Sequence, residues 1–312
     1  MSAGTDVDRG AEAAAPAIVG RSPWSLGWAR LRRDRAAMIS LGLIVLVIAM
    51  ALLAPLAAVI TGHPPNTQYR TPDALSPEGL PVGPSGRFWF GTDDLGRDIF
   101  VRIAYGARVS LLVGVAATAL AVAIGVVVGL AAGFLGGVTD TLLARFVDVV
   151  LSVPFILVAI ALVSVSGSGL GVSITVIGSF SWAAIARIVR GQVLSLRERE
   201  FVEAARSLGA RSVRIMFVEI LPNVLAPIVV YATLLMPVAI VAQASLSYLG
   251  LGLPPPTADW GGMISAGQKH YTTAWWYIVF PGAALLVTTV AFNLLGDGVR
   301  DAFDPRAGLR KG

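Results

Sequence analysis

Residues 197–223 read REREFVEAARSLGARSVRIMFVEILPN, and this stretch decides the fold. It is rich in arginine and glutamate, yet it lies between two long runs that carry no charge. A charged segment held between membrane spans has to lie in water on one side of the bilayer. The stretch therefore indicates a loop between transmembrane helices.

The composition favours a membrane protein over a soluble one. Of the 312 residues, 55% are hydrophobic and only 14% are charged, whereas soluble domains carry about 25% charged residues. The net charge of +5 comes almost wholly from arginines that flank apolar runs, a pattern that sets membrane topology and argues against nucleic-acid binding. Because the chain has no cysteine, disulfides, thiolate metal sites and cysteine nucleophiles are excluded.

Six apolar segments are long enough to cross a hydrocarbon core, which takes about 20 residues. An even number of spans places both ends of the chain on the same side of the membrane. Arginine clusters before the first span, around the quoted stretch and after the last span put both ends inside. We therefore expect an all-α polytopic fold, N-in and C-in, with spans at 36–60, within 109–139, at 142–164, 172–189 and 224–246, and from an aromatic belt at 271–277 to 295.

These spans divide the chain into segments with different environments. The N-terminal tail, 1–35, is expected to be cytoplasmic; its first 20 residues lack an apolar period and are expected to be disordered. Trp24 and Trp28, with the arginines at 21–35, form an interfacial anchor before the first span. The other segments are the span 36–60, an extracytoplasmic loop at 61–107, a core domain at 108–296 that contains the loop 197–223, and a cytoplasmic tail at 297–312.

The outer loop ends in the motif GTDDLGRD at 91–98. Two adjacent acids followed by glycine invite a calcium-loop interpretation, but the alternating oxygen ligands and the final glutamate are missing. We instead expect Thr92 or Asp93 to cap an amphipathic helix that lies against the outer face of the membrane domain, with Asp94 in its first turn. Its apolar face would consist of Leu95, Ile99 and Ile103, and its ion pair of Asp98 and Arg102.

Small residues recur at every fourth position along the second apolar run. In lipid the hydrophobic drive between helices is weak, so a stripe of small residues supplies packing by letting two backbones approach closely. Ordinary helix packing and a mobile interface along a transport path both agree with this pattern. The stripe consists of Ala117, Ala121, Gly125, Gly129, Gly133 and Gly137.

No set of residues predicts an enzyme active site. His63 and His270 lie in different outer loops without an acid or a second histidine at ligand spacing, and both are expected to be solvated. The sequence has no phosphate-binding loop of the G-x-x-x-x-G-K-[ST] type. Any nucleotide chemistry must therefore come from a partner chain.

The quoted stretch predicts two short helices joined by a turn, lying along the membrane. Residues 201–208 favour a helix, and Gly209 suits its C-terminal cap. Ser212 would cap a second short helix that runs to Ile220, and Pro222 would open the next span, where a missing N–H costs nothing. The small side chains at the centre would let a partner approach closely, although a solvated amphipathic connector fits the same pattern.

Four motifs together resemble those of ABC-importer permeases, the membrane subunits of binding-protein-dependent transporters. Glu203-Ala-Ala205, Gly209 and Ile220-Leu-Pro222 resemble the coupling motif of that family. The other motifs resemble the dipeptide/oligopeptide (and nickel) branch, in the subunit type with the GTDDLGRD motif. They are residues 91–98 with YGAR at 105–108, SLSYLGLG at 245–252 with PPP at 254–256 and WG at 260–261, and NLLGDG at 293–298 with RD at 300–301.

The resemblance implies a type I ABC-importer permease fold with six transmembrane helices in the bacterial plasma (inner) membrane. It implies a channel-forming subunit that couples ATPase motion to alternating access for di- and oligopeptides, with neither an ATPase site nor a cofactor of its own. The implied partners are a homologous second permease, two cytoplasmic ATPases that bind ATP and Mg, an extracytoplasmic peptide-binding protein and membrane lipid. An importer of nickel or another small solute, and a membrane receptor or scaffold without transport, are the alternatives.

The resemblance also assigns candidate residues, none of them catalytic or metal-binding. Gln243 stands where this branch often has glutamate; an amide cannot titrate, which puts a role in charge recognition in doubt and favours a hydrogen bond to a neighbouring helix. Gln243, Ser245 and Asn293 are the candidates for the translocation path or gate. The candidates for ATPase coupling are Glu203, Ala204, Ala205, Arg206, Leu208, Gly209, Ile220, Leu221 and Pro222, and those of the outer-loop motif are Gly91, Thr92, Asp93, Asp94, Gly96, Arg97 and Asp98.

Overall fold

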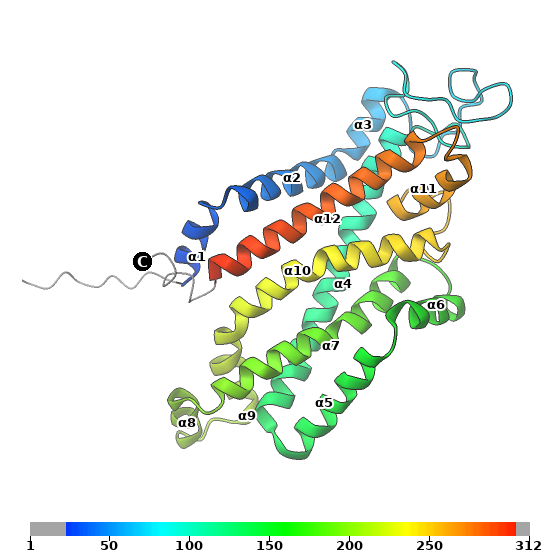
Figure 1. Cartoon of the computed structure of the whole chain (residues 1–312). Helices are drawn as coiled ribbons and strands as arrows, with labels where there is room; N and C mark the ends of the chain where they lie inside the picture. The colour runs from blue at the N-terminus through cyan, green and yellow to red at the C-terminus, as the bar shows by residue number, and fades with distance from the viewer. Residues whose placement is uncertain (1–22, 304–312) are drawn as a thin grey trace, which may run out of the picture.

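The computed structural model describes residues 23–303, and within that range the chain is built from helices, with two isolated β-bridges and no longer strand (Figure 1). The predictions for residues 1–20 and for the cationic residues of the C-terminal tail at 306–311 lie outside the described range. The all-α polytopic fold class is confirmed. Within residues 23–303, five helices are long and apolar enough to cross a membrane, or six if one bent pair counts as a span.

The first predicted span is divided into two helices. After the short helix α1 (Pro23–Leu31), Asp34 caps α2 (Arg35–Leu52) by accepting hydrogen bonds from the backbone N–H groups of Ala36 and Ala37. The chain then resumes as α3 (Ala54–Thr61). Pro55 explains the break, because it has no N–H to donate to the preceding turn and its ring clashes with that turn. The span predicted at 36–60 thus consists of two helices with a break at Leu53.

The predicted amphipathic helix of the outer loop is part of a much longer helix, α4 (Ile99–Leu135). Asp98 is its N-cap, accepting hydrogen bonds from the N–H groups of Phe100 and Val101, so Thr92 and Asp93 do not start it and Leu95 precedes it. The predicted Asp98–Arg102 pair is wrong for the same reason, because the carboxylate of Asp98 turns to its own helix terminus. At 1.5 Å per residue, the 37 residues of α4 span about 55 Å, more than a bilayer core.

The small-residue stripe of α4 packs against α7 (Leu170–Leu196). A Cβ added at Gly125 or Gly129 would lie 2.7 Å or less from backbone or side-chain atoms of α7, and one at Gly133 would meet Val193 at 2.7 Å. The close backbone approach predicted for these positions is thus confirmed. Gly137, by contrast, begins the next helix, and a Cβ added there would have nothing within 4 Å.

The predicted third span is broken. Residues 137–166 form α5 (Gly137–Ser152) and α6 (Phe155–Ser166), which are bent by 85° with respect to each other. Pro154 lies at the bend, where it cannot continue the hydrogen-bond ladder of α5. The predicted turn at 166–171 is confirmed, because α6 ends at Ser166 and α7 begins at Leu170.

The remaining helices complete the membrane domain. After α7 come α8 (Glu200–Ser207), α9 (Ser212–Arg214), a π turn (Ile215–Ile220) and α10 (Leu221–Tyr248). Between α10 and the aromatic belt, the chain forms a helix, α11 (Trp260–Gly267), followed by a 3₁₀ turn at 268–270. α12 (Trp276–Phe303) ends the described chain. Of the predicted aromatic belt, Tyr271 and Trp275 are exposed, whereas Trp276 and Tyr277 are buried.

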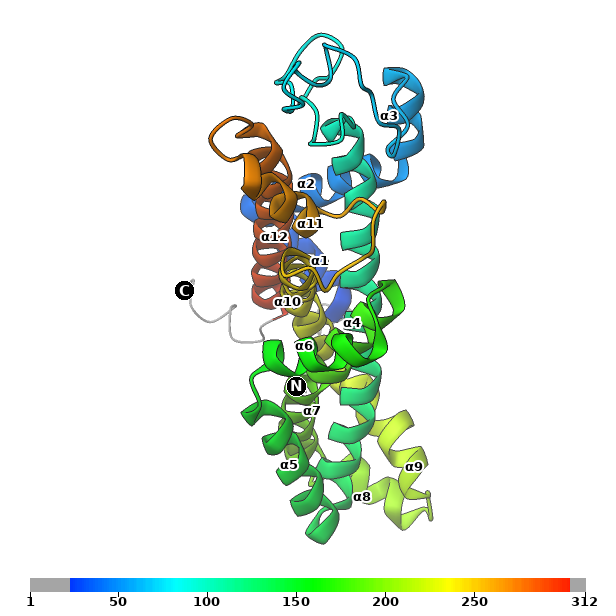
Figure 2. The same ribbon diagram turned by 90° about the vertical axis from the view of Figure 1, so that its right-hand side faces the viewer.

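The helices α2, α12, α10 and α7 run side by side in that order (Figure 1). At one end of this layer lie α1, α8, α9 and the C-terminal end of α12. At the opposite end lie α3, α6, α11 and the loop between α3 and α4 (Figures 1 and 2). The charged stretch at 197–223 and the motif at 91–98 therefore lie at opposite ends of the spans, as their assignment to opposite sides of the membrane requires.

Candidate functional site

The helix α8 and the two residues that follow it present five of the nine candidate coupling residues to the surface. Val202 is fully buried and Ala205 is half-buried, so this face attaches α8 to the rest of the chain. Glu203, Ala204 and Arg206 lie on the exposed face. The predicted cap is confirmed: Gly209 follows α8 with φ of +78°, a left-handed conformation that side chains with a Cβ rarely adopt.

An apolar core fixes α8 on three other helices. Val202 packs in one cluster with Leu130 of α4, Val193 of α7 and Ile220 of the π turn. The guanidinium of Arg206 lies 5.2 Å from the ring centre of Phe134 on α4. A force applied to α8 therefore reaches α4, α7 and α10 through packed side chains.

Beyond this core, α8, the residue that follows it and α9 expose large apolar side chains. Leu208 is 88% exposed, Val213 is 63% exposed and Phe201 is 38% exposed. Large apolar side chains that gather with arginine and glutamate at the end of a membrane domain are typical of a protein–protein contact. This exposed set, with Glu203 and Gly209, is called the coupling surface below.

The second predicted short helix, from Ser212 to Ile220, corresponds to α9 and the π turn, and it continues into α10 without a break. Residues 212–248 form one continuous helical run, which includes α9, the π turn and α10. In the π turn the N–H of Leu221 donates to the carbonyl of Met216, five residues earlier. Pro222 cannot donate to the preceding turn, and the wider π turn accommodates this gap. Ser212 begins the run but makes no side-chain cap, whereas Pro222 is the second residue of α10, in the first turn as predicted.

At the outer end, the motif 91–98 folds as a loop around one carboxylate. Asp93 accepts hydrogen bonds from the N–H groups of Leu95 and Arg97, both at 2.9 Å, and from Nε of Arg97 at 2.6 Å. Nε of Arg102, on α4, lies 3.4 Å from Asp93 Oδ2. Asp94 accepts a hydrogen bond from the hydroxyl of Tyr277 on α12. The motif thus joins the outer loop to α4 and α12.

The other motif residues shape the turns of that loop. Thr92 donates its hydroxyl to the carbonyl of Ala74 at 2.6 Å. Gly91 and Gly96 both have positive φ, and a Cβ on Gly96 would overlap the carbonyl of Tyr69. Glycine is required at 96 both for its conformation and for this close approach.

His63 is buried, so the expectation that it is a solvated loop residue was wrong. Its Nδ1 lies 2.8 Å from Asp98 Oδ2, and its ring stacks on Phe88 with the centres 4.4 Å apart. Burial raises the pKa of the Asp98 carboxyl, whereas the hydrogen bonds with His63 and the N–H groups of α4 oppose that rise. A separation of 35 residues hid this contact from any reading of local spacing.

The three path candidates are not brought together. Gln243 is fully buried near the outer end of α10, and Ser245 is half-buried two residues further on. Ser245 lines an open groove of about 440 Å³ between α10 and α11, together with Val241, Ala244, Tyr248, Gly261 and Ile264. Asn293 lies exposed on α12 and is not among the residues that line this groove.

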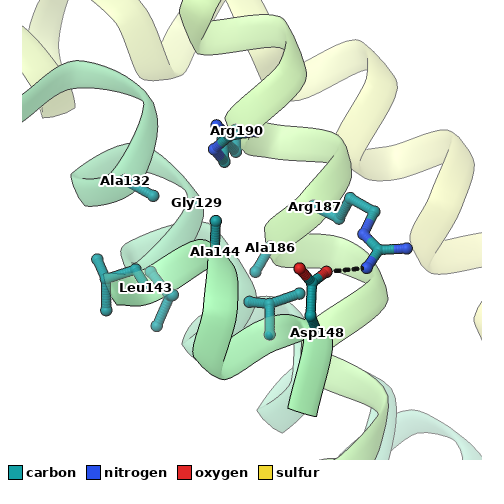
Figure 3. Close-up of a pocket in the computed structure, with 10 residues that line it drawn as sticks. Gly129, Ala132, Leu143, Ala144, Asp148, Ala186, Arg187 and Arg190 are labelled. Carbon is teal, nitrogen blue, oxygen red and sulfur yellow. Dashed lines mark hydrogen bonds and ion pairs between the residues drawn. The ribbon is translucent and has the colours of Figure 1, made fainter. Parts of the chain in front are cut away.

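Towards the inner end, α4, α5 and α7 enclose a cavity of about 120 Å³ that the sequence did not predict (Figure 3). Its walls are small residues such as Gly129, Ala144 and Ala186. Arg187 of α7 donates to Asp148 of α5 at 2.6 Å. Arg190 of α7, at the cavity wall, pairs with Asp140 of α5. These two ion pairs tie α5 to α7.

Comparisons with known proteins agree with these features. Residues 125–308 match the family described as "Binding-protein-dependent transport system inner membrane component", and residues 22–77 match the "N-terminal TM domain of oligopeptide transport permease C". The chain is 44% identical over 290 residues to the oligopeptide transport system permease protein OppC of Bacillus subtilis (strain 168), covering 93% of this chain and 91% of that protein.

Two further relatives carry other substrate names. The dipeptide transport system permease protein DppC of Alkalihalophilus pseudofirmus is 41% identical, with 91% of this chain and 90% of that protein covered. The glutathione transport system permease protein GsiD of Shigella flexneri serotype 5b is 43% identical, with 92% and 91% covered. With a family match over more than half of the residues and relatives similar over nearly their whole length, this chain belongs to the inner membrane components of binding-protein-dependent transport systems, as a bacterial membrane permease and not an enzyme.

Proposed function

We propose that this chain is one of two permease subunits of an ATP-driven importer for di- or oligopeptides. The relatives named for oligopeptide, dipeptide and glutathione transport support peptides as the substrate class. In the proposed complex, the chain pairs with a homologous permease, two cytoplasmic ATPases and an extracytoplasmic peptide-binding protein. ATP and Mg bind to the ATPases, and the permease contributes the path.

The coupling surface is the observation that carries this proposal. It combines an exposed apolar residue, Leu208, with the exposed charge of Glu203, and it stands on a buried core that reaches α4, α7 and α10. A solvated connector would need neither an exposed apolar side chain nor a buried core that joins it to three other helices. When the ATPases close on ATP, α8 would be displaced and the spans would alternate their access.

The groove lined by Ser245 is the best-supported wall of the path. It is open, it lies between α10 and α11, and its lining is apolar apart from Ser245 and the hydroxyl of Tyr248. Such a lining would tolerate varied side chains of a peptide. A second permease facing this groove would close it into a path.

The experiment is reconstitution of the purified complex with its binding protein in nanodiscs, with peptide-stimulated ATP turnover as the readout. Glu203→Lys reverses the exposed charge of the coupling surface, and we expect it to leave the chain in the membrane but abolish stimulation. Gly209→Trp should have the same effect. Gly209→Ala is its control, because the left-handed φ strains both variants, whereas the alanine Cβ meets nothing within 4 Å and leaves the surface free for a partner.

Full stimulation in Glu203→Lys and in Gly209→Trp would contradict the coupling role. If the chain purifies without any ATPase subunit, the receptor or scaffold alternative is favoured. Thermal-shift screening of the binding protein against peptides and metal chelates separates the peptide importer from an importer of nickel or another small solute.

A further inference from the structure

Gln243 is a meeting point of three helices at the outer end of the membrane domain. Its side chain is fully buried. Its Nε2 donates to the hydroxyl of Ser247 on α10 at 2.9 Å, and its Oε1 accepts from the hydroxyl of Ser110 on α4 at 3.5 Å. Nε2 also lies 3.4 Å from Asp259 Oδ1, at the start of α11. The amide therefore uses both of its ends, donating from the nitrogen and accepting at the oxygen.

Asp259 supplies a buried carboxylate at this place. It is 3% exposed, and its Oδ1 caps α11 by accepting from the N–H of Gly262 at 2.9 Å. The sequence signal for this cap was present, since an aspartate directly before Trp260-Gly-Gly is a helix start. What the sequence did not show is that this acid meets Gln243, sixteen residues earlier.

The other charged groups near Asp259 lie across a cavity of about 130 Å³. Arg97 of the outer loop, Arg102 of α4 and Tyr277 of α12 line this cavity with Asp259. No ion pair joins Asp259 to these arginines among the described residues, and Arg97 and Arg102 are engaged with Asp93. Gln243 and the N–H of Gly262 are therefore its direct hydrogen-bond donors in the described part of the chain.

Gln243 places an amide, and not a second carboxylate, against Asp259. Two carboxyl groups in contact at a buried site cannot both be ionised, because their charges repel and little water screens them. An amide at 243 avoids the repulsion and donates a hydrogen bond to the charge.

The contact lies where α10 and α11 touch most closely. A Cβ on Gly261 would overlap the carbonyl of Ala244, so the backbones of the two helices are in direct contact at this point. Further along, Ser265 donates its hydroxyl to the carbonyl of Tyr248 at 2.7 Å. The same two helices form the walls of the groove that contains Ser245. Ile156 of α6 and Leu285 of α12 complete its lining.

We propose that Gln243 is a positioning residue that holds α11 against α10 through the single carboxylate of Asp259, and that this contact sets the outer mouth of the groove. The relevance of the groove to transport rests on the proposed function, whereas the contact between Gln243 and Asp259 does not depend on it. The pair requires one amide and one carboxylate, and either position can carry the carboxylate as long as the other carries the amide.

The test uses the natural lack of cysteine in this chain. Ser245→Cys places a single thiol in the groove, and its rate of reaction with a membrane-impermeant thiol reagent reports how open the mouth is. The labelling ratio is this rate in the Gln243→Glu background divided by the rate of the Ser245→Cys parent at the same pH. We expect the ratio to rise about tenfold between about pH 5 and pH 8, because the proton shared by the introduced carboxyl and Asp259 is lost over this range. Division by the parent removes the pH dependence of the thiol itself.

The exchanged variant Gln243→Glu with Asp259→Asn is the matched control. It keeps one carboxylate, one amide and the cap of α11, since an asparagine oxygen can accept from Gly262. We expect its labelling ratio to stay near one at every pH. Asp259→Asn alone removes the charge but keeps the cap, and it should also show no pH-dependent rise.

The proposal is overturned if Gln243→Glu labels like the parent at all pH values, or if the exchanged variant is as pH-sensitive as Gln243→Glu. Should Gln243→Glu fail to reach the membrane, the exchanged variant decides: its failure as well would overturn the proposal. Labelling of the chain in membranes requires no ATPase. A parent complex without peptide-stimulated turnover would therefore count against the proposed function and leave this result standing.

Discussion

Truncation of Leu208 to alanine tests the coupling surface with little risk to the fold. Leu208 is 88% exposed, so almost all of its apolar surface is free to be buried by a partner. Full burial of a leucine contributes about 1.5–3 kcal/mol, and alanine retains only one of its four side-chain carbons. We therefore expect Leu208→Ala to weaken ATPase binding by about 1–2 kcal/mol, which is roughly 5- to 30-fold in affinity.

The assay is titration of fluorescently labelled ATPase against the permease in nanodiscs. Stability should change by less than about 0.5 kcal/mol, because an exposed side chain is removed. Val165→Ala is the matched control: Val165 is 89% exposed, but it lies on α6 at the opposite end of the spans (Figure 1). Equal ATPase affinity in Leu208→Ala and Val165→Ala would refute the assignment of this surface.

Three other substitutions test the packing by thermal unfolding in detergent. Gly129→Ala should destabilise the chain by about 1–3 kcal/mol through overpacking against α7, whereas Gly42→Ala, with nothing near its Cβ, should be neutral or stabilising. Trp260→Phe leaves the carbonyl of Ile103 without its indole donor and should cost about 1–3 kcal/mol, whereas Trp275→Phe, at an exposed site, should stay within about 0.5 kcal/mol. Asp34→Ala removes the cap of α2 and should cost about 0.5–2 kcal/mol, which an asparagine at the same position should largely restore.

The sequence located the helices better than their interruptions. Uncharged runs, the turn at 166–171 and the left-handed Gly209 all follow from local chemistry, and the structure agrees with them. Prolines were the difficulty, because α10 contains Pro227 and Pro237 without a break, whereas Pro55 and Pro154 lie where helices end. In a membrane domain, neighbouring helices decide whether a proline is accommodated, and that information is not local.

The polar contacts were beyond sequence reasoning for a related reason. Spacing rules find pairs three or four residues apart, such as Asp93 with Arg97, although the sequence suggested Asp98 with Arg102 instead. The pairs of His63 with Asp98 and of Gln243 with Asp259 join residues 35 and 16 positions apart. They exist because the outer loop and α11 fold back on α4 and α10, a property of the tertiary structure alone.

The π turn at 215–220 has a consequence for how this helix can vary. A π turn contains one more residue than an α-helical turn, and it lies between the coupling end of the run 212–248 and the outer end of that run. Loss of one residue within the turn would return it to α-helical geometry and leave the angular register beyond it nearly unchanged. Loss of one residue from α10 between Leu221 and Gln243 would instead turn Gln243 by about 100° and shift it by about 1.5 Å. Gln243 would then face away from Asp259 although neither residue had changed. The inner end of this run can therefore absorb a change of length that α10 cannot.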